Sequence, residues 1–129
     1  MIKIKESGQE ILKKAEWAAI ATSGKDGPHL VGTWGDALRA FPLQGEDILL
    51  LPAGHYHRTE ENLKQDPRVQ ILLCTREVKN SHGVPGQGLC LSGTAELRDS
   101  GPYFDRVRAR FPWARAALVV TLRDSETQL

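Results

Sequence analysis

Short apolar stretches separated by turn residues run through most of the 129-residue chain. Stretches of this length, either alternating or fully apolar, are typical of β-strands. The pattern predicts strands at 17–22, 29–34, 47–51, 69–75, 89–98 and 116–122, with a further short strand at 38–41. Short turns join most of them, and helices do not alternate with strands as in a doubly wound parallel sheet. The strands are therefore expected to pair antiparallel.

The stretch 89–98 alternates most regularly. One face carries Leu89, Leu91, Gly93, Ala95 and Leu97, and the other carries Cys90, Ser92, Thr94, Glu96 and Arg98. A strand with one apolar face fits the wall of a barrel. The stretch 29–34 also divides into two faces, with Leu30, Gly32 and Trp34 on one and His29, Val31 and Thr33 on the other. Before it, Asp26-Gly27 is a strong hairpin signal.

Three segments have helical signals. Ser7 to Glu10 form a capping box ahead of apolar residues at helical spacing, which predicts a helix over about 7–16. Pro102 fits the first position of a helix that ends before Pro112. The third helix follows the strand at 47–51. In contrast, residues 78–88 hold three glycines and one proline and are expected to form a flexible loop.

The chain is thus expected to be a single domain over residues 1–129. It is mainly β, with about six to seven antiparallel strands in a small barrel and two or three short helices. With 17 basic and 16 acidic residues, the net charge of +1 favours neither a nucleic acid nor a membrane surface as partner. No segment has the pattern of a signal peptide or a membrane span, so a cytoplasmic location is expected. Cys74 and Cys90 lie among apolar neighbours and are expected to be buried, reduced thiols.

Residues 52–67 carry the main candidate site. Pro52 is expected to end the strand before it, Gly54 to permit a tight turn, and Thr59 to cap a helix that stops before Pro67. A helix N-terminus offers unpaired N–H groups and a positive dipole end, so it favours a phosphate, which Arg58 could also grip. The alternative is a capped helix that binds only water. His55 and His57 share a face, but no third ligand at suitable spacing is evident, so no metal is expected.

Five motifs occur in one order along the chain. They are Ala19-Ile-Ala-Thr22, Asp26-Gly-Pro-His-Leu-Val31, Thr33-Trp34, His57-Arg-Thr-Glu60 and Trp113-Ala-Arg-Ala-Ala-Leu-Val119. Together they resemble the FMN-binding split-barrel superfamily that contains pyridoxamine 5′-phosphate oxidase, and most of all its small dimeric bacterial members. The resemblance covers about residue 10 to the C-terminus and implies a split barrel with bound FMN.

The resemblance also implies roles for individual residues. Arg58 and Thr59 match the pair that holds the FMN phosphate, with Gly54 and His55 in the preceding turn and His57 beside them. The segment that matches the strand along the isoalloxazine ring comprises Gly32, Thr33, Trp34, Gly35, Asp36 and Ala37. Trp113 and Leu129 match residues that reach the flavin from the second subunit, which implies a homodimer. A core or interface position is the structural alternative for Trp34 and Trp113.

The ring segment departs from its relatives. They have asparagine at the positions of Gly32 and Gly35, and serine and tyrosine at those of Asp36 and Ala37. The glycines would lose side-chain hydrogen bonds to the flavin, and Asp36 would disfavour a reduced anion. Gly35 and Ala37 are expected to open room beside the ring for a small substrate.

Three functions follow from these considerations. The favoured one is an electron-transfer flavoprotein that serves a redox partner protein. The alternative is an FMN-dependent oxidoreductase that acts on a small molecule, because flavin chemistry needs little from the protein beyond orientation and electrostatics. The third is a module that binds another phosphorylated ligand or another flavin. The sequence alone leaves it undecided whether the chain is an enzyme.

Overall fold

The computed structural model describes residues 4–45 and 47–129. The first three residues of the N-terminal segment, in which no signal-peptide pattern is found, lie outside this part. The elements are α1 (Glu6–Lys14), β1 (Trp17–Gly24), β2 (Gly27–Trp34), α2 (Gly35–Leu38), β3 (Ile48–Ala53), α3 (His57–Gln65), β4 (Arg68–Lys79), β5 (Pro85–Arg98), α4 (Pro102–Arg110) and β6 (Ala116–Thr127).

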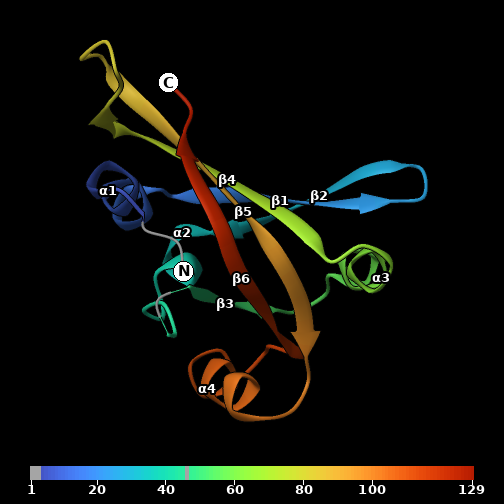
Figure 1. Ribbon diagram of the computed structural model, residues 1–129. Helices are drawn as coiled ribbons and strands as arrows, with labels where there is room; N and C mark the ends of the chain where they lie inside the picture. Colours follow the sequence, from blue (N-terminus) through green and yellow to red (C-terminus); the bar gives the residue numbers. More distant parts are fainter. Residues whose placement is uncertain (1–3, 46) are drawn as a thin grey trace.

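The strands form one antiparallel sheet in the order β2-β1-β4-β5-β6-β3, which curls into a half-barrel (Figure 1). The expected mainly β, split-barrel class is confirmed, with six strands and four helices in the described ranges. The predicted hairpin is present, with Gly24 paired to Gly27 across a two-residue turn. Gly27 has φ 116°, a conformation that glycine adopts without strain.

The main core fills the concave side of the sheet. Apolar residues that alternate along β1, β4 and β5 meet Ile11 of α1 there, and Ile11, Ile20, Ile71 and Leu91 are at most 1% exposed. A second cluster lies between α4 and the other face of β3 and β6, around Leu50 and Val107. Because β3 and the first part of β6 are covered on both faces, residues 48–53 and 116–120 are continuously apolar rather than alternating.

Pro52 does not end the strand before it, as the sequence predicts. It lies inside β3, opposite Ala117 of β6. β3 is an edge strand of the sheet, and an edge tolerates a proline because one side of the strand makes no ladder bonds.

The predicted strand at 38–41 is also wrong. The short helix α2 occupies 35–38, and its Arg39 Nη1 donates to the carbonyl of Ala15 at 2.8 Å. The predicted helix at 7–16 begins one residue earlier and ends two residues earlier, and its capping box does not form. Lys5 is the N-cap, so Ser7 lies inside the helix.

Most of the predicted loop at 78–88 is strand. β4 runs to Lys79 and β5 starts at Pro85, so only residues 80–84 form the turn. The two cysteines are free but not buried as expected, since Cys74 is exposed and Cys90 is partly exposed. Their positions on β4 and β5 point to the convex side of the sheet, away from the core.

Candidate functional site

The junction between β3 and α3 comprises residues 54–56 and ends with an unusual tyrosine. Tyr56 is the N-cap of α3 and has φ 59°, the only positive φ of a non-glycine residue in the described ranges. The first helical hydrogen bond runs from the Glu60 N–H to the Tyr56 carbonyl at 2.9 Å. The N–H groups of His57, Arg58 and Thr59 come before that bond, so the helix provides no acceptors for them.

Thr59 does not cap the helix, as the sequence predicts. It is the third helical residue, and its side chain is completely buried. Its Oγ1 has no hydrogen-bond partner among the described residues. Buried hydroxyl groups are nearly always paired, so this atom is suited to a ligand oxygen at the start of the helix. The first turn of α3 therefore offers hydrogen-bond donors without acceptors, a pattern that favours an anion.

Arg58 lines a cleft between α3 and the β1–β2 hairpin. The cleft has a volume of about 860 Å³ and is bounded by residues 23–29 and by Arg58, Glu61, Asn62 and Lys64 of α3. Deeper in this region, the Asn62 amide donates to Thr22 Oγ1 at 3.1 Å and ties α3 to β1. Arg58 thus has open space beside the first turn of α3.

Arg115, the residue just before β6, holds the turn that precedes α3. Arg115 donates from Nε and Nη2 to the carbonyl of His55, at 2.8 and 2.6 Å. Its Nη1 lies 3.2 Å from a carboxylate oxygen of Glu60. Sequence reasoning did not single out Arg115, although it stands in the last of the five motifs.

The structure brings Trp113 and Gly54 together within one chain. A Cβ on Gly54 would lie 3.2 Å from a ring carbon of Trp113, so glycine lets the indole approach the turn closely. The indole is 61% exposed and also meets Phe111 edge to face at 5.6 Å. The expectation that Trp113 serves the second subunit stays a prediction.

Tyr56 connects the junction to β2. Its hydroxyl donates to the carbonyl of Gly32 at 2.8 Å. Burial raises the pKa of the phenol above its ordinary value, and hydrogen bonding with the Thr33 side chain opposes the shift. The phenol is therefore a neutral donor near pH 7. The segments 32–37 and 54–59, which the sequence analysis treated separately, meet through this bond. No sequence signal marks Tyr56 beyond its place between two histidines.

Neighbouring residues already fill the space where a side chain would stand on the two glycines of the ring segment. A Cβ on Gly35 would lie 1.9 Å from the carbonyl oxygen of Ala15, and one on Gly32 would lie 2.4 Å from the Trp17 indole. Ala37 is buried. Gly35 nevertheless lines a pocket, so the expectation that Gly35 and Ala37 open room for a substrate stays a prediction.

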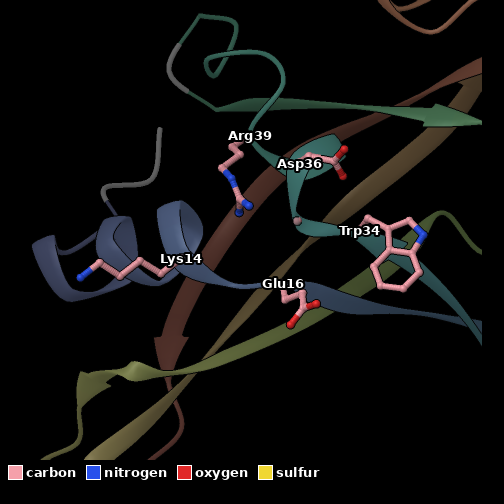
Figure 2. Close-up of a pocket in the computed structure, with 6 residues that line it drawn as sticks. Lys14, Glu16, Trp34, Asp36 and Arg39 are labelled. Carbon is pink, nitrogen blue, oxygen red and sulfur yellow. The ribbon is translucent and has the colours of Figure 1, made fainter.

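Asp36 lies beside a shallow pocket of about 590 Å³. Lys14, Glu16, Trp34, Gly35, Asp36 and Arg39 line it (Figure 2). In Figure 2 the Arg39 side chain points toward the end of α1, whereas the Asp36 carboxylate points away from it. Asp36 Oδ1 accepts from the Ala37 N–H at 3.0 Å.

Leu129 lies far from the junction in its own chain. Its N–H donates to Gln87 Oε1 at 2.7 Å, and Gln87 Nε2 donates to its carbonyl at 2.5 Å. Gln87 pairs with Thr75, whereas α3 leads into the other end of β4 (Figure 1).

His55 and His57 pack edge to face with their ring centroids 6.2 Å apart. In the ranges 4–45 and 47–129, no group of three or more His, Cys, Asp or Glu side chains could hold a metal ion.

A curled sheet of six antiparallel strands accompanied by four helices in the described ranges defines a split-barrel domain. The chain belongs to the pyridoxamine 5′-phosphate oxidase family, whose model matches residues 4–127. It is 46% identical over 120 residues to a protein of Nitratidesulfovibrio vulgaris (strain DSM 19637 / Miyazaki F) named "FMN-binding protein", covering 93% of this chain and 94% of the relative.

Solved structures share the fold at low sequence identity. A single-residue variant of HupZ from Group A Streptococcus is 14% identical with a TM-score of 0.74, covering 98% of this chain and all of that one. An FMN-binding protein of Syntrophomonas wolfei subsp. wolfei is 13% identical with a TM-score of 0.68, covering 96% and 85%. An F420 reductase is 17% identical with a TM-score of 0.62, covering 95% and 98%. None of the helices in the described ranges has the length and hydropathy needed to cross a membrane.

Proposed function

We propose that this chain is an FMN-binding flavoprotein that carries electrons for a redox partner protein. The observation that carries the proposal is the start of α3, where three N–H groups lack helical acceptors and the buried Thr59 hydroxyl lacks a partner among the described residues. The 46% identical relative named "FMN-binding protein" supports FMN as the ligand.

The FMN phosphate would bind at the first turn of α3. The N–H groups of His57, Arg58 and Thr59 and the positive end of the helix dipole favour an anion there. Thr59 Oγ1 would donate to a phosphate oxygen, and the Arg58 guanidinium would neutralise part of the charge. Gly54, His55 and Arg115 would keep the turn in place, since Arg115 binds the His55 carbonyl.

The isoalloxazine ring would lie along the free edge of β2. Gly24 and Gly27 close the hairpin, so the antiparallel pattern turns the N–H and C=O groups of Leu30, Gly32 and Trp34 away from β1. Apart from the Gly32 carbonyl, which accepts from the Tyr56 hydroxyl, these groups are available to the polar edge of a ring, with Thr33 and the start of α2 at Gly35 and Asp36 beside them. Bound FMN supplies one- and two-electron chemistry.

A second copy of the chain would complete the site. Trp17, Leu30, Trp34 and Leu72 lie on the convex face of β2, β1 and β4 and are 50%, 65%, 65% and 47% exposed. A contiguous apolar face of this kind marks a protein interface. Trp113 and Leu129, both more than half exposed, are then free to reach the partner's flavin. We call Trp17, Leu30, Trp34 and Leu72 the convex apolar face.

The ring segment favours electron transfer over catalysis on a substrate. In the segment 32–37 the only ionisable side chain is that of Asp36, and it accepts a hydrogen bond from the Ala37 N–H. Reoxidation that accelerates with one added small molecule would instead favour the oxidoreductase.

The test is a titration of the protein with FMN and with riboflavin, which lacks the phosphate. Wild-type protein should bind FMN much more tightly than riboflavin. Arg58→Ala should weaken FMN binding about tenfold or more, because a charge-assisted contact is lost, and leave riboflavin binding nearly unchanged. Arg108→Ala, which removes the same charge from the exposed side of α4, is the matched control. Equal affinity for the two ligands in wild-type protein would contradict the proposal that the start of α3 binds the FMN phosphate.

A further inference from the structure

Tyr56 combines two features that local sequence does not explain. It holds a left-handed backbone conformation with φ 59°, which a bulky side chain rarely adopts. It also makes a hydrogen bond to the carbonyl of Gly32, a residue 24 positions earlier in the chain. Strained backbone of this kind persists where the surrounding structure fixes it, and it gathers at binding sites.

Tyr56 contacts both parts of the proposed site, the first turn of α3 through its backbone and the free edge of β2 through its side chain. Its backbone carbonyl accepts the first hydrogen bond of α3, from the Glu60 N–H, so the residue fixes where the free N–H groups of the first turn begin. Its hydroxyl reaches the Gly32 carbonyl on the free edge of β2. An edge strand has ladder bonds on one side only, so little else fixes its free side.

We infer that Tyr56 is a positioning residue that sets the separation between the first turn of α3 and the free edge of β2. A ligand with a phosphate at one end and a flat ring at the other can contact both the first turn of α3 and the edge of β2 only if the distance between them matches its length. This inference rests on the proposed function. Tyr56 adds little contact energy of its own and preorganises the site instead.

The neighbouring side-chain hydrogen bonds of Arg115 and Asn62 do not link the junction to β2. Arg115 holds the turn through the His55 carbonyl and Glu60, and thus ties it to β6 rather than to β2. Asn62 ties α3 to Thr22, which lies on β1. The bond from Tyr56 to Gly32 is therefore a direct link between the junction and the strand that would bear the ring.

Tyr56→Phe tests the inference because it removes only the hydroxyl. We expect FMN affinity to fall roughly threefold to tenfold, as for the loss of one hydrogen bond, while riboflavin affinity stays within about twofold. The preference for FMN over riboflavin is the decisive quantity. A purely structural role would weaken both ligands together or would change only thermal stability.

Two controls make the outcome specific. Tyr103→Phe removes the only other tyrosine hydroxyl, which lies on α4, and should leave both affinities unchanged. In an Arg58→Ala background, Tyr56→Phe should lower FMN affinity much less. The phosphate is then bound weakly, so the distance between the first turn of α3 and the edge of β2 matters less for binding.

The failures of the two proposals are distinguishable. If wild-type protein binds no FMN, the proposed function fails. If wild-type protein prefers FMN and Tyr56→Phe keeps the full preference, or adds independently to Arg58→Ala, the positioning role is overturned alone.

Discussion

The hydroxyl of Thr59 is the atom on which the proposed site depends most. It is buried and without a partner among the described residues, at a helix start whose first three N–H groups also lack helical acceptors. An unpaired buried hydroxyl costs about 1–3 kcal/mol, so the fold keeps it at the expense of stability. A bound phosphate would give it a partner.

Thr59→Val separates these two effects because valine has nearly the same shape. Without ligand, the free energy of unfolding should rise by about 1 kcal/mol, since an unpaired polar group disappears. FMN affinity should fall roughly fivefold to tenfold. Urea unfolding and a flavin titration measure the two quantities. A variant that is less stable and binds FMN normally would show that Thr59 has only a structural role.

Two glycines of the ring segment differ in what surrounds them. A Cβ on Gly35 meets the backbone carbonyl of Ala15, which cannot move without shifting the end of α1. A Cβ on Gly32 meets the Trp17 indole, which is half exposed and can rotate away. Neither neighbour is close in sequence, so no local pattern predicts them.

Gly35→Ala should therefore lower the free energy of unfolding by about 2–3 kcal/mol, as expected for overpacking against backbone. Gly32→Ala should change it by less than about 1 kcal/mol. Denaturant unfolding of the two variants side by side provides the comparison. Equal losses would contradict the packing described for this segment.

At the scale of elements, local signals predicted most strands and the helix α4. The alternation along β5 and the Asp26-Gly27 hairpin signal needed no tertiary information, although the turn itself is Lys25-Asp26, and Pro102 marked the start of α4. The failures came where tertiary packing prevailed. Pro52 is tolerated because β3 is an edge strand, and strand order is not visible in a local sequence window.

The elements of the candidate site were predicted from local signals, whereas the contact that joins them was not. Both elements were expected, although the helix begins three residues earlier than predicted, at His57, and the strand two residues earlier, at Gly27. The link between them was not, because the Tyr56–Gly32 bond spans 24 residues and follows no motif. Thr59 was assigned as a cap because its residue type suits one, whereas the left-handed Tyr56 starts the helix.

The C-terminal end of α3 has a pH-sensitive pair. Hydrogen bonds from Arg68 lower the pKa of Asp66 from 3.8 to about 2. Its folded pKa is below its unfolded pKa, so this contribution is complete above about pH 4 and is lost as the pH falls toward 2. Asp66→Asn should remove that part of the acid dependence of stability. A carboxyl titration by NMR should give a midpoint near 2, and a midpoint near 3.8 would contradict the pair.

At the scale of the whole molecule, the convex apolar face is a feature that the fold of one chain leaves unexplained. Its four side chains are about half to two thirds exposed, while the concave side of the same strands is packed. Burial of these side chains in a homodimer would remove apolar surface from water at about 25 cal/mol per Å². The proposed flavin would then lie beside the interface, since Trp34 belongs both to this face and to the ring segment.

Leu30→Asp tests the dimer. A charge on the convex apolar face should raise the dimer dissociation constant at least about tenfold, because the carboxylate must lose its hydration on association. FMN affinity should fall with it if the second subunit completes the site. Val84→Asp, in the exposed β4–β5 turn, is the matched control. Sedimentation velocity measures assembly, and an unchanged dimer would exclude this face as the interface.

The most direct test of the account is size-exclusion chromatography of the protein mixed with FMN, followed by protein and flavin absorption together. We predict that flavin absorption elutes with the protein at the size of a dimer, and that Arg58→Ala loses it. Flavin that elutes only at the position of free FMN, at protein concentrations well above those expected for tight binding, would contradict the claim that the start of α3 holds its phosphate.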